Sequence, residues 1–72
     1  MTVGEDRVRI KFNPSADGLV DQLKQKSAEL IDMCDRGFDN AHNGEIKRLW
    51  SLAMTHYEDA AMWAVKAATA TK

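Results

Sequence analysis

The feature that most constrains this chain is a long stretch, residues 46–70, that contains no glycine or proline. Almost every residue in it is a fair helix former, which predicts one continuous helix of roughly 40 Å at about 1.5 Å per residue. Apolar residues recur along it at alternating steps of four and three: Ile46, Trp50, Ala53, Tyr57, Ala60, Ala64 and Ala67. A second apolar row lies beside this face: Leu49, Met54, Ala61, Val65 and Ala68. One partner helix cannot cover so wide a surface, so the sequence predicts several neighbours.

An earlier amphipathic pattern, from about residue 16 to residue 36, predicts a helix that packs on this one. Its apolar stripe is formed by Leu19 or Val20, Leu23, Ser27, Leu30 and Cys34. Gly37 is expected to end this helix, and Asp39, Asn40 or Asn43 can cap the second helix, at about residues 40–70. Because the link is short, the helices should be antiparallel neighbours. The expected fold is an all-α antiparallel helical hairpin in one domain, residues 1–72.

Residues 1–14 are expected to form a short arm in front of the hairpin. Residues 1–6 are polar and expected to be loose, while residues 7–12 alternate charged and apolar side chains, which predicts an extended segment. A lone strand of this length is not stable by itself, so the arm must lie on the helices or pair with another chain. Pro14 ends the arm, because it fixes its own φ and pushes Asn13 out of helical space.

Length and charge narrow the class of protein. A chain of 72 residues often needs disulfides, a metal or association to be stable. Cys34 is the only cysteine and no Cys/His cluster has zinc-site spacing, so association remains. The net charge of −1, without a basic stripe, disfavours binding to duplex nucleic acid. No apolar run approaches the roughly 20 residues of a membrane span, and no signal peptide opens the chain, which indicates a soluble cytoplasmic protein.

The residue pattern offers little for catalysis. Glu58 and Asp59 are adjacent and point about 100° apart on a helix, and Asp32 is expected on the solvated face. All three are interpreted as solvated carboxylates. Ser51 and His56 do not form an obvious nucleophile–base pair. The two histidines have no metal-ligand spacing. We therefore expect no enzyme activity, no catalytic residue, no bound metal and no cofactor.

The start of the first helix is a better candidate for a binding site. Phe12 directly precedes a helix N-terminus whose free N–H groups, from about Ser15 to Gly18, can hold an anion. Lys24 and Lys26 follow on the same helix, and an aromatic ring beside amides and a lysine suits a nucleotide. The alternative is that Phe12 is a hydrophobic staple and the lysines only aid solubility. From the pattern alone, this alternative is the better interpretation.

The second helix carries Arg48 near its start and Thr69 near its end. Arg48 is interpreted either as a phosphate clamp in a cleft of an oligomer or as a surface ion pair with an acid of the first helix. Trp50, Trp63, Met54 and Met62 recur at helical spacing, which is more typical of core and subunit contacts than of a cofactor site.

Several segments together carry a resemblance to a known family. They are residues 12–15 (Phe-Asn-Pro-Ser), 20–24 and 28–32, then Arg48, Ala53, Thr55 and Glu58, and above all residues 60–67, Ala-Ala-Met-Trp-Ala-Val-Lys-Ala. This pattern resembles the phage anti-CBASS cyclic-oligonucleotide sponges, whose helical-hairpin domain is similar to one in anti-Thoeris sponges. The resemblance covers about residues 7–70, nearly the whole chain.

The resemblance implies a homohexamer of helical hairpins in the cytoplasm of an infected bacterial host. Such a sponge sequesters cyclic dinucleotides, and in some members cyclic trinucleotides, without cleaving them, and so blocks CBASS immunity. By position, the dinucleotide site falls on Phe12 as the stacking aromatic and Lys24 as the lysine, with Lys26 as the alternative and Ser15 at the helix start. The trinucleotide site falls on Arg48 and the region of Thr69. The competing hypothesis is a small structural or adaptor hairpin that binds a protein partner.

Overall fold

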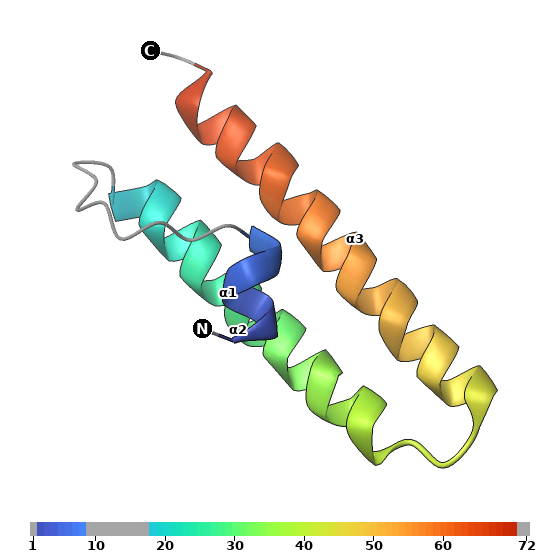
Figure 1. Ribbon diagram of the computed structural model, residues 1–72. Coiled ribbons are helices and arrows are strands. Elements are labelled where there is room, and N and C mark those ends of the chain that lie inside the picture. The colour runs from blue at the N-terminus through green and yellow to red at the C-terminus, as the bar shows by residue number, and fades with distance from the viewer. Residues whose placement is uncertain (1, 9–17, 71–72) are drawn as a thin grey trace.

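The computed structural model describes residues 2–8 and 18–70 of the chain. Within these ranges it contains three helices and no strand: α1 (Val3–Val8), α2 (Gly18–Asn40) and α3 (Gly44–Thr69). The long helices α2 and α3 run antiparallel, and α1 lies across α2 (Figure 1). The molecule measures 45 × 21 × 12 Å, so it is little more than one helical layer thick. The all-helical hairpin predicted from the sequence is confirmed, and none of the described helices combines the length and hydropathy of a membrane span.

Capping defines the start of α3. The Asn43 side chain, one of three predicted caps, accepts a hydrogen bond from the backbone N–H of Ile46 at 2.8 Å. Glu45 in the first turn and Lys66 in the last complement the helix dipole. At the other end the N–H of Ala70 donates to the carbonyl of Ala67 at 3.3 Å. The polar connection is therefore reduced to residues 41–43, which forces α3 back along α2.

The buried core is a thin seam between the two long helices. Ile31, Cys34 and Met54 form its centre, and Ile31 is fully buried. Val8, Phe38 and Ala53 are partly buried and pack against this centre, which ties α1 to the hairpin. Cys34 is a free, buried thiol, as expected of a small hydrophobe. In the described part of the chain, more of the large apolar side chains are exposed than buried.

The expectation that Gly37 ends the first long helix is wrong, because α2 continues to Asn40. The structure gives this glycine a different role, in helix–helix packing. A Cβ atom on Gly37 would lie well inside van der Waals contact of Cε2 of Trp50. The Trp50 ring of α3 therefore rests on bare backbone of α2, and the glycine allows the close approach.

The expectation of a loose and extended N-terminal arm is also wrong for its first part, since residues 3–8 form α1. A reciprocal capping box explains the helix. The Thr2 hydroxyl accepts from the N–H of Glu5 at 3.0 Å, and the Glu5 carboxylate accepts from the N–H of Thr2 at 2.9 Å. This Thr-x-x-Glu signal outweighs the alternation of charged and apolar residues. Residues 9–14 of the predicted arm lie outside the described residues.

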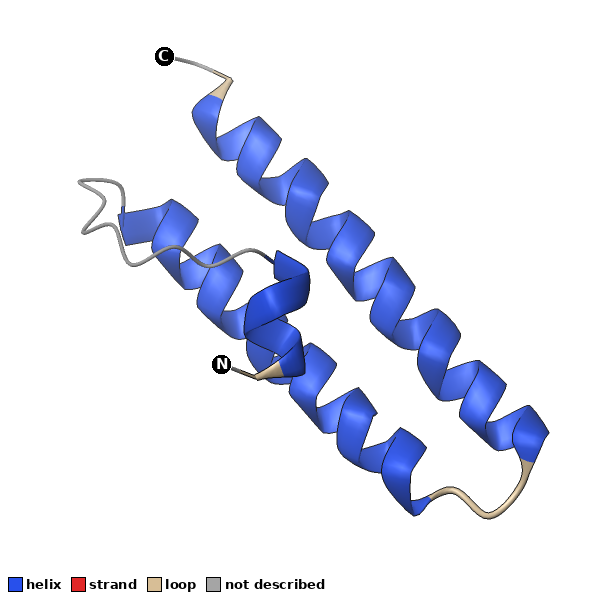
Figure 2. Cartoon of the chain, viewed as in Figure 1, coloured by secondary structure: helices blue, strands red, loops and turns tan. Residues whose placement is uncertain are grey.

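Helix α1 lies across α2 (Figure 2), and its buried residue Gly4 faces the α2 backbone. A Cβ atom on Gly4 would meet the backbone of Ala28, with the Ala28 carbonyl oxygen nearest, so only glycine allows this crossing. The backbone N–H of Gly4 donates to the Asp32 carboxylate at 2.6 Å. The expectation that Asp32 is a solvated surface acid is therefore wrong: it is half-buried and satisfies a free N–H at the start of α1.

We predict that Gly37→Ala destabilises the hairpin, because the new methyl group must displace the Trp50 ring. Overpacking of this kind costs typically about 1–3 kcal/mol, which exceeds the roughly 1 kcal/mol that alanine gains over glycine in a helix. Gly44→Ala is the matched control, since nothing lies within 4 Å of a Cβ atom there. Urea denaturation compares the two variants, and a midpoint for Gly37→Ala at or above that of the control would contradict the packing role.

Candidate functional site

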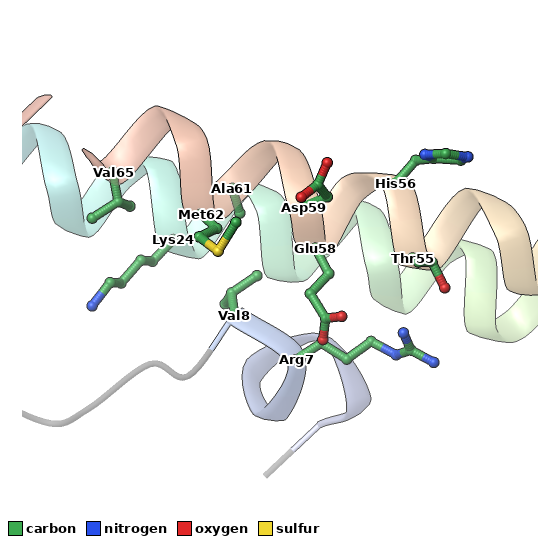
Figure 3. Close-up of a pocket in the computed structure, with 10 residues that line it drawn as sticks. All are labelled: Arg7, Val8, Lys24, Thr55, His56, Glu58, Asp59, Ala61, Met62 and Val65. Atoms are coloured by element: carbon green, nitrogen blue, oxygen red, sulfur yellow. The ribbon is translucent and has the colours of Figure 1, made fainter. Parts of the chain in front are cut away.

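A cavity of about 660 Å³ lies beside the crossing of α1 with the hairpin (Figure 3). Its volume falls in the range of roughly 300–1,000 Å³ that is typical of small-molecule sites. All three helices contribute to its lining, which consists of Arg7, Val8, Lys24, Thr55, His56, Glu58, Asp59, Ala61, Met62 and Val65. The cavity is therefore large enough for a nucleotide-sized ligand and combines apolar with charged groups.

The placement of α1 creates the cavity. Because α1 packs mainly on α2 and has few contacts with α3, its C-terminal end leaves a hollow against α3. Apolar side chains from both helices form the floor of this hollow: Val8 of α1, and Ala61, Met62 and Val65 of α3. Ala61 is buried, and its small side chain leaves room above it. An apolar floor of this kind accepts the faces of planar rings and reduces the local dielectric around nearby charges.

The charged groups occupy different parts of the cavity. Lys24 of α2 extends past Met62 and Val65 at one end, whereas Arg7 of α1 and Glu58 of α3 lie at the other end (Figure 3). Lys24, Arg7 and Glu58 are all half-buried. Asp59 and His56 are exposed, and in Figure 3 their side chains point away from α1. The cavity thus has one end with a lone cation and one end with a cation and a carboxylate.

The residues predicted for the dinucleotide site differ in whether they line the cavity. Lys24 lines the cavity, while Lys26 is exposed and is not among the lining residues. The assignment of the dinucleotide site to either lysine stays a prediction. Phe12 and Ser15 lie outside the described residues, in the segment that connects Val8, a lining residue, with the start of α2.

The residues predicted for the trinucleotide site lie far apart in one chain. Arg48 and Thr69 stand near opposite ends of α3, about 30 Å apart at 1.5 Å per residue. The Thr69 hydroxyl donates to the Val65 carbonyl at 2.9 Å. A single copy of the chain therefore does not bring Arg48 and Thr69 to one ligand.

Arg48 forms a bidentate ion pair with Glu45, with both N–O distances at 2.8 Å. The interpretation of Arg48 as paired with an acid of the first helix is wrong, because Glu45 belongs to the same helix, three residues earlier. The hydrogen bond from Arg48 holds the pKa of Glu45 below its ordinary value, and the same bond raises the pKa of Arg48. Both groups are solvent-exposed, so a phosphate can compete with Glu45 for the guanidinium.

Sequence reasoning missed two contributions to the cavity. Arg7 and Val8 were placed on opposite faces of an extended arm, but helix α1 brings both to the cavity. The capping box formed by Thr2 and Glu5 was the available signal for that helix. Glu58 was interpreted as a solvated carboxylate, and only the tertiary structure shows that it faces a cavity. Among the described residues, no group of three His, Cys, Asp or Glu side chains could hold a metal ion.

Comparison with known proteins gives one result. A family model described as the hairpin domain of Acb2/Tad1 matches residues 4–69, from the buried glycine of α1 to the last residue of α3. No curated protein and no solved structure is significantly similar to the chain. The match therefore covers all but the ends of the chain and includes every residue that lines the cavity.

We predict that Asp32→Ala releases α1 from α2, because the Gly4 N–H loses its charged acceptor. Hydrogen bonds to charged groups contribute about 1.5–3 kcal/mol. Hydrogen exchange at the Asp6 amide, which donates to the Thr2 carbonyl within α1, should accelerate about tenfold or more. Asp39→Ala, at an exposed position on the same helix, is the control and should leave the exchange unchanged. Unaltered protection in Asp32→Ala would show that this contact does not hold α1.

Proposed function

The chain belongs to the Acb2/Tad1 hairpin family, the family of anti-CBASS and anti-Thoeris sponges, and we propose on this basis that it sequesters cyclic dinucleotides. The bound messenger stays intact and is withheld from the effector of the host defence, which blocks CBASS immunity. The protein acts in the cytoplasm of the infected bacterial host. The single observation that carries this proposal is the family match over residues 4–69.

The cavity supports the proposal through its size and its chemistry. Lys24 offers a phosphate a charge-assisted hydrogen bond, and the apolar floor of Val8, Ala61 and Met62 suits a base. Phe12, which follows Val8 by four residues, is the proposed stacking aromatic, and Ser15 the proposed polar contact at the helix start. Sequestration requires only affinity: nanomolar binding corresponds to about −12 kcal/mol. The proposed function needs no catalytic group, so in this proposal the protein is not an enzyme.

Assembly of several copies completes the proposal. Large apolar side chains along both long helices remain 36–56% exposed: Leu19, Leu30, Met33, Ile46, Leu49, Trp50, Leu52, Tyr57, Met62 and Trp63. So much apolar surface on so small a chain is typical of subunit interfaces. We propose that copies of the chain bury this surface in a homo-oligomer, with six subunits as the expected number.

A second ligand site follows from assembly. Because Arg48 and Thr69 lie at opposite ends of α3, a cyclic trinucleotide can meet both only where different copies bring these ends together. In this proposal the trinucleotide phosphate displaces Glu45 from Arg48.

We predict that a cyclic dinucleotide raises the melting temperature of the protein, since it binds the folded state only. At a ligand concentration 100 times Kd the stabilisation is about 2.7 kcal/mol. After heat denaturation, chromatography should recover the ligand chemically unchanged. A panel of cyclic dinucleotides that produces neither heat nor a melting shift would instead favour the adaptor hypothesis, and recovery of linear nucleotide would indicate a phosphodiesterase.

Two variants and a control locate the site in the same experiment. Lys24→Ala and Phe12→Ala should abolish dinucleotide capture without dissolving the oligomer. Lys26→Ala removes the same charge from an exposed position two residues away and should retain capture. Full binding by both Lys24→Ala and Phe12→Ala would place the site elsewhere.

We predict that the protein sediments as an oligomer at micromolar concentration. Trp63→Glu should shift it toward the 8.1 kDa subunit, because it places a charge in the exposed apolar surface. Gln25→Glu introduces the same side chain at an exposed polar position and should not change the sedimentation coefficient. A well-behaved single subunit for the unmodified chain would refute assembly.

A further inference from the structure

One end of the cavity presents a carboxylate and a guanidinium from different helices. The Glu58 side chain extends from α3 toward α1, where Arg7 lies beside the cavity (Figure 3). Among the described residues, the one ion pair joins Arg48 and Glu45. Arg7 and Glu58 therefore do not form an ion pair with each other. An acceptor and a donor therefore stand side by side, half-buried, and both remain available to a ligand.

This end is unsuited to a phosphate but suited to a base. The charges of Glu58 and Arg7 offset each other at this end, whereas the Lys24 cation at the other end attracts an anion. Phosphate and base are thus directed to opposite ends of one cavity. The apolar floor between them, formed by Val8, Ala61 and Met62, strengthens the hydrogen bonds that the charged groups make.

Guanine is the base that matches this pair. Its N1–H and N2–H groups are adjacent donors, and a carboxylate can accept from both with its two oxygens. Its O6 and N7 atoms are the acceptors that an arginine recognises. Adenine presents an acceptor at N1, which the carboxylate repels, and an amino group where the arginine requires an acceptor. Uracil and cytosine each lack the two adjacent donors.

We propose that Glu58 and Arg7 form a base-reading pair that makes the protein prefer guanine-containing cyclic dinucleotides over those that contain only adenine. The inference rests on the proposed function and adds selectivity to it. Glu58 determines specificity through its two acceptor oxygens, and Arg7 through donors to the neighbouring O6 and N7 atoms of the base. Lys24 contributes affinity that does not depend on the base.

Calorimetric titration with cyclic di-GMP and with cyclic di-AMP tests the inference through the ratio of two Kd values. The unmodified protein should bind cyclic di-GMP about tenfold or more tightly than cyclic di-AMP, as expected for one bidentate base contact. Glu58→Gln replaces one acceptor with a donor, which complements the N1 and N6 positions of adenine. The ratio should therefore fall by about tenfold or more, through weaker binding of cyclic di-GMP and stronger binding of cyclic di-AMP.

Glu29→Gln is the matched control. It makes the same substitution at an exposed position of α2 that does not line the cavity, and it should leave the ratio unchanged. Because each ratio is measured within one variant, a general loss of stability affects both ligands equally. Equal affinity of the unmodified protein for the two ligands, or an unchanged ratio in Glu58→Gln, would overturn the inference and leave the proposed function standing. Failure of both ligands to bind would instead refute the proposed function.

Discussion

The structure depends on close contacts that glycine makes possible, because the core alone is too thin to fix the three helices. Gly37 lets the Trp50 ring lie on the backbone of α2, and Gly4 lets α1 touch the backbone at Ala28. At each position a Cβ atom would fall inside van der Waals contact. The hydrogen bond from the Gly4 N–H to the Asp32 carboxylate then fixes the position of α1 along α2, because a hydrogen bond is directional and packing is not. These two contacts set the helix positions, and the cavity follows from those positions.

The long helices could be predicted from the sequence, because their apolar periodicity and the cap at Asn43 are local signals. The end of α2 could not be predicted, because a glycine such as Gly37 can either end a helix or lie within one at a close contact. Only the tertiary structure shows that Trp50 packs on Gly37 and that the helix continues. The fold of residues 3–8 was readable in principle from Thr2 and Glu5. The alternating pattern that follows concealed it, because six residues are too few for periodicity to distinguish helix from strand.

The candidate site was predictable only in part, for a related reason. Lys24 was identified through the family resemblance, and the structure places it in the cavity. Arg7 and Glu58 are separated by most of the chain, and they share a cavity only because α1 crosses α2 and stops short of α3. No local pattern encodes that crossing. The crossing depends on the close packing of Gly4 in α1 against the backbone of Ala28 in α2, and neither segment predicts that contact by itself.

A chain this small has little apolar surface to spare, yet it leaves a cavity and a broad apolar face open. In a stable monomer both would weaken the fold, because exposed apolar area contributes nothing to burial. The exposed apolar face and the open cavity are explained if the same surfaces serve folding, assembly and ligand capture. Under the proposed function, copies that cover the apolar face would stabilise the hairpin. A ligand in the cavity would add contacts between α1 and α3, the pair of helices that touch least. Binding and stability would then rise together.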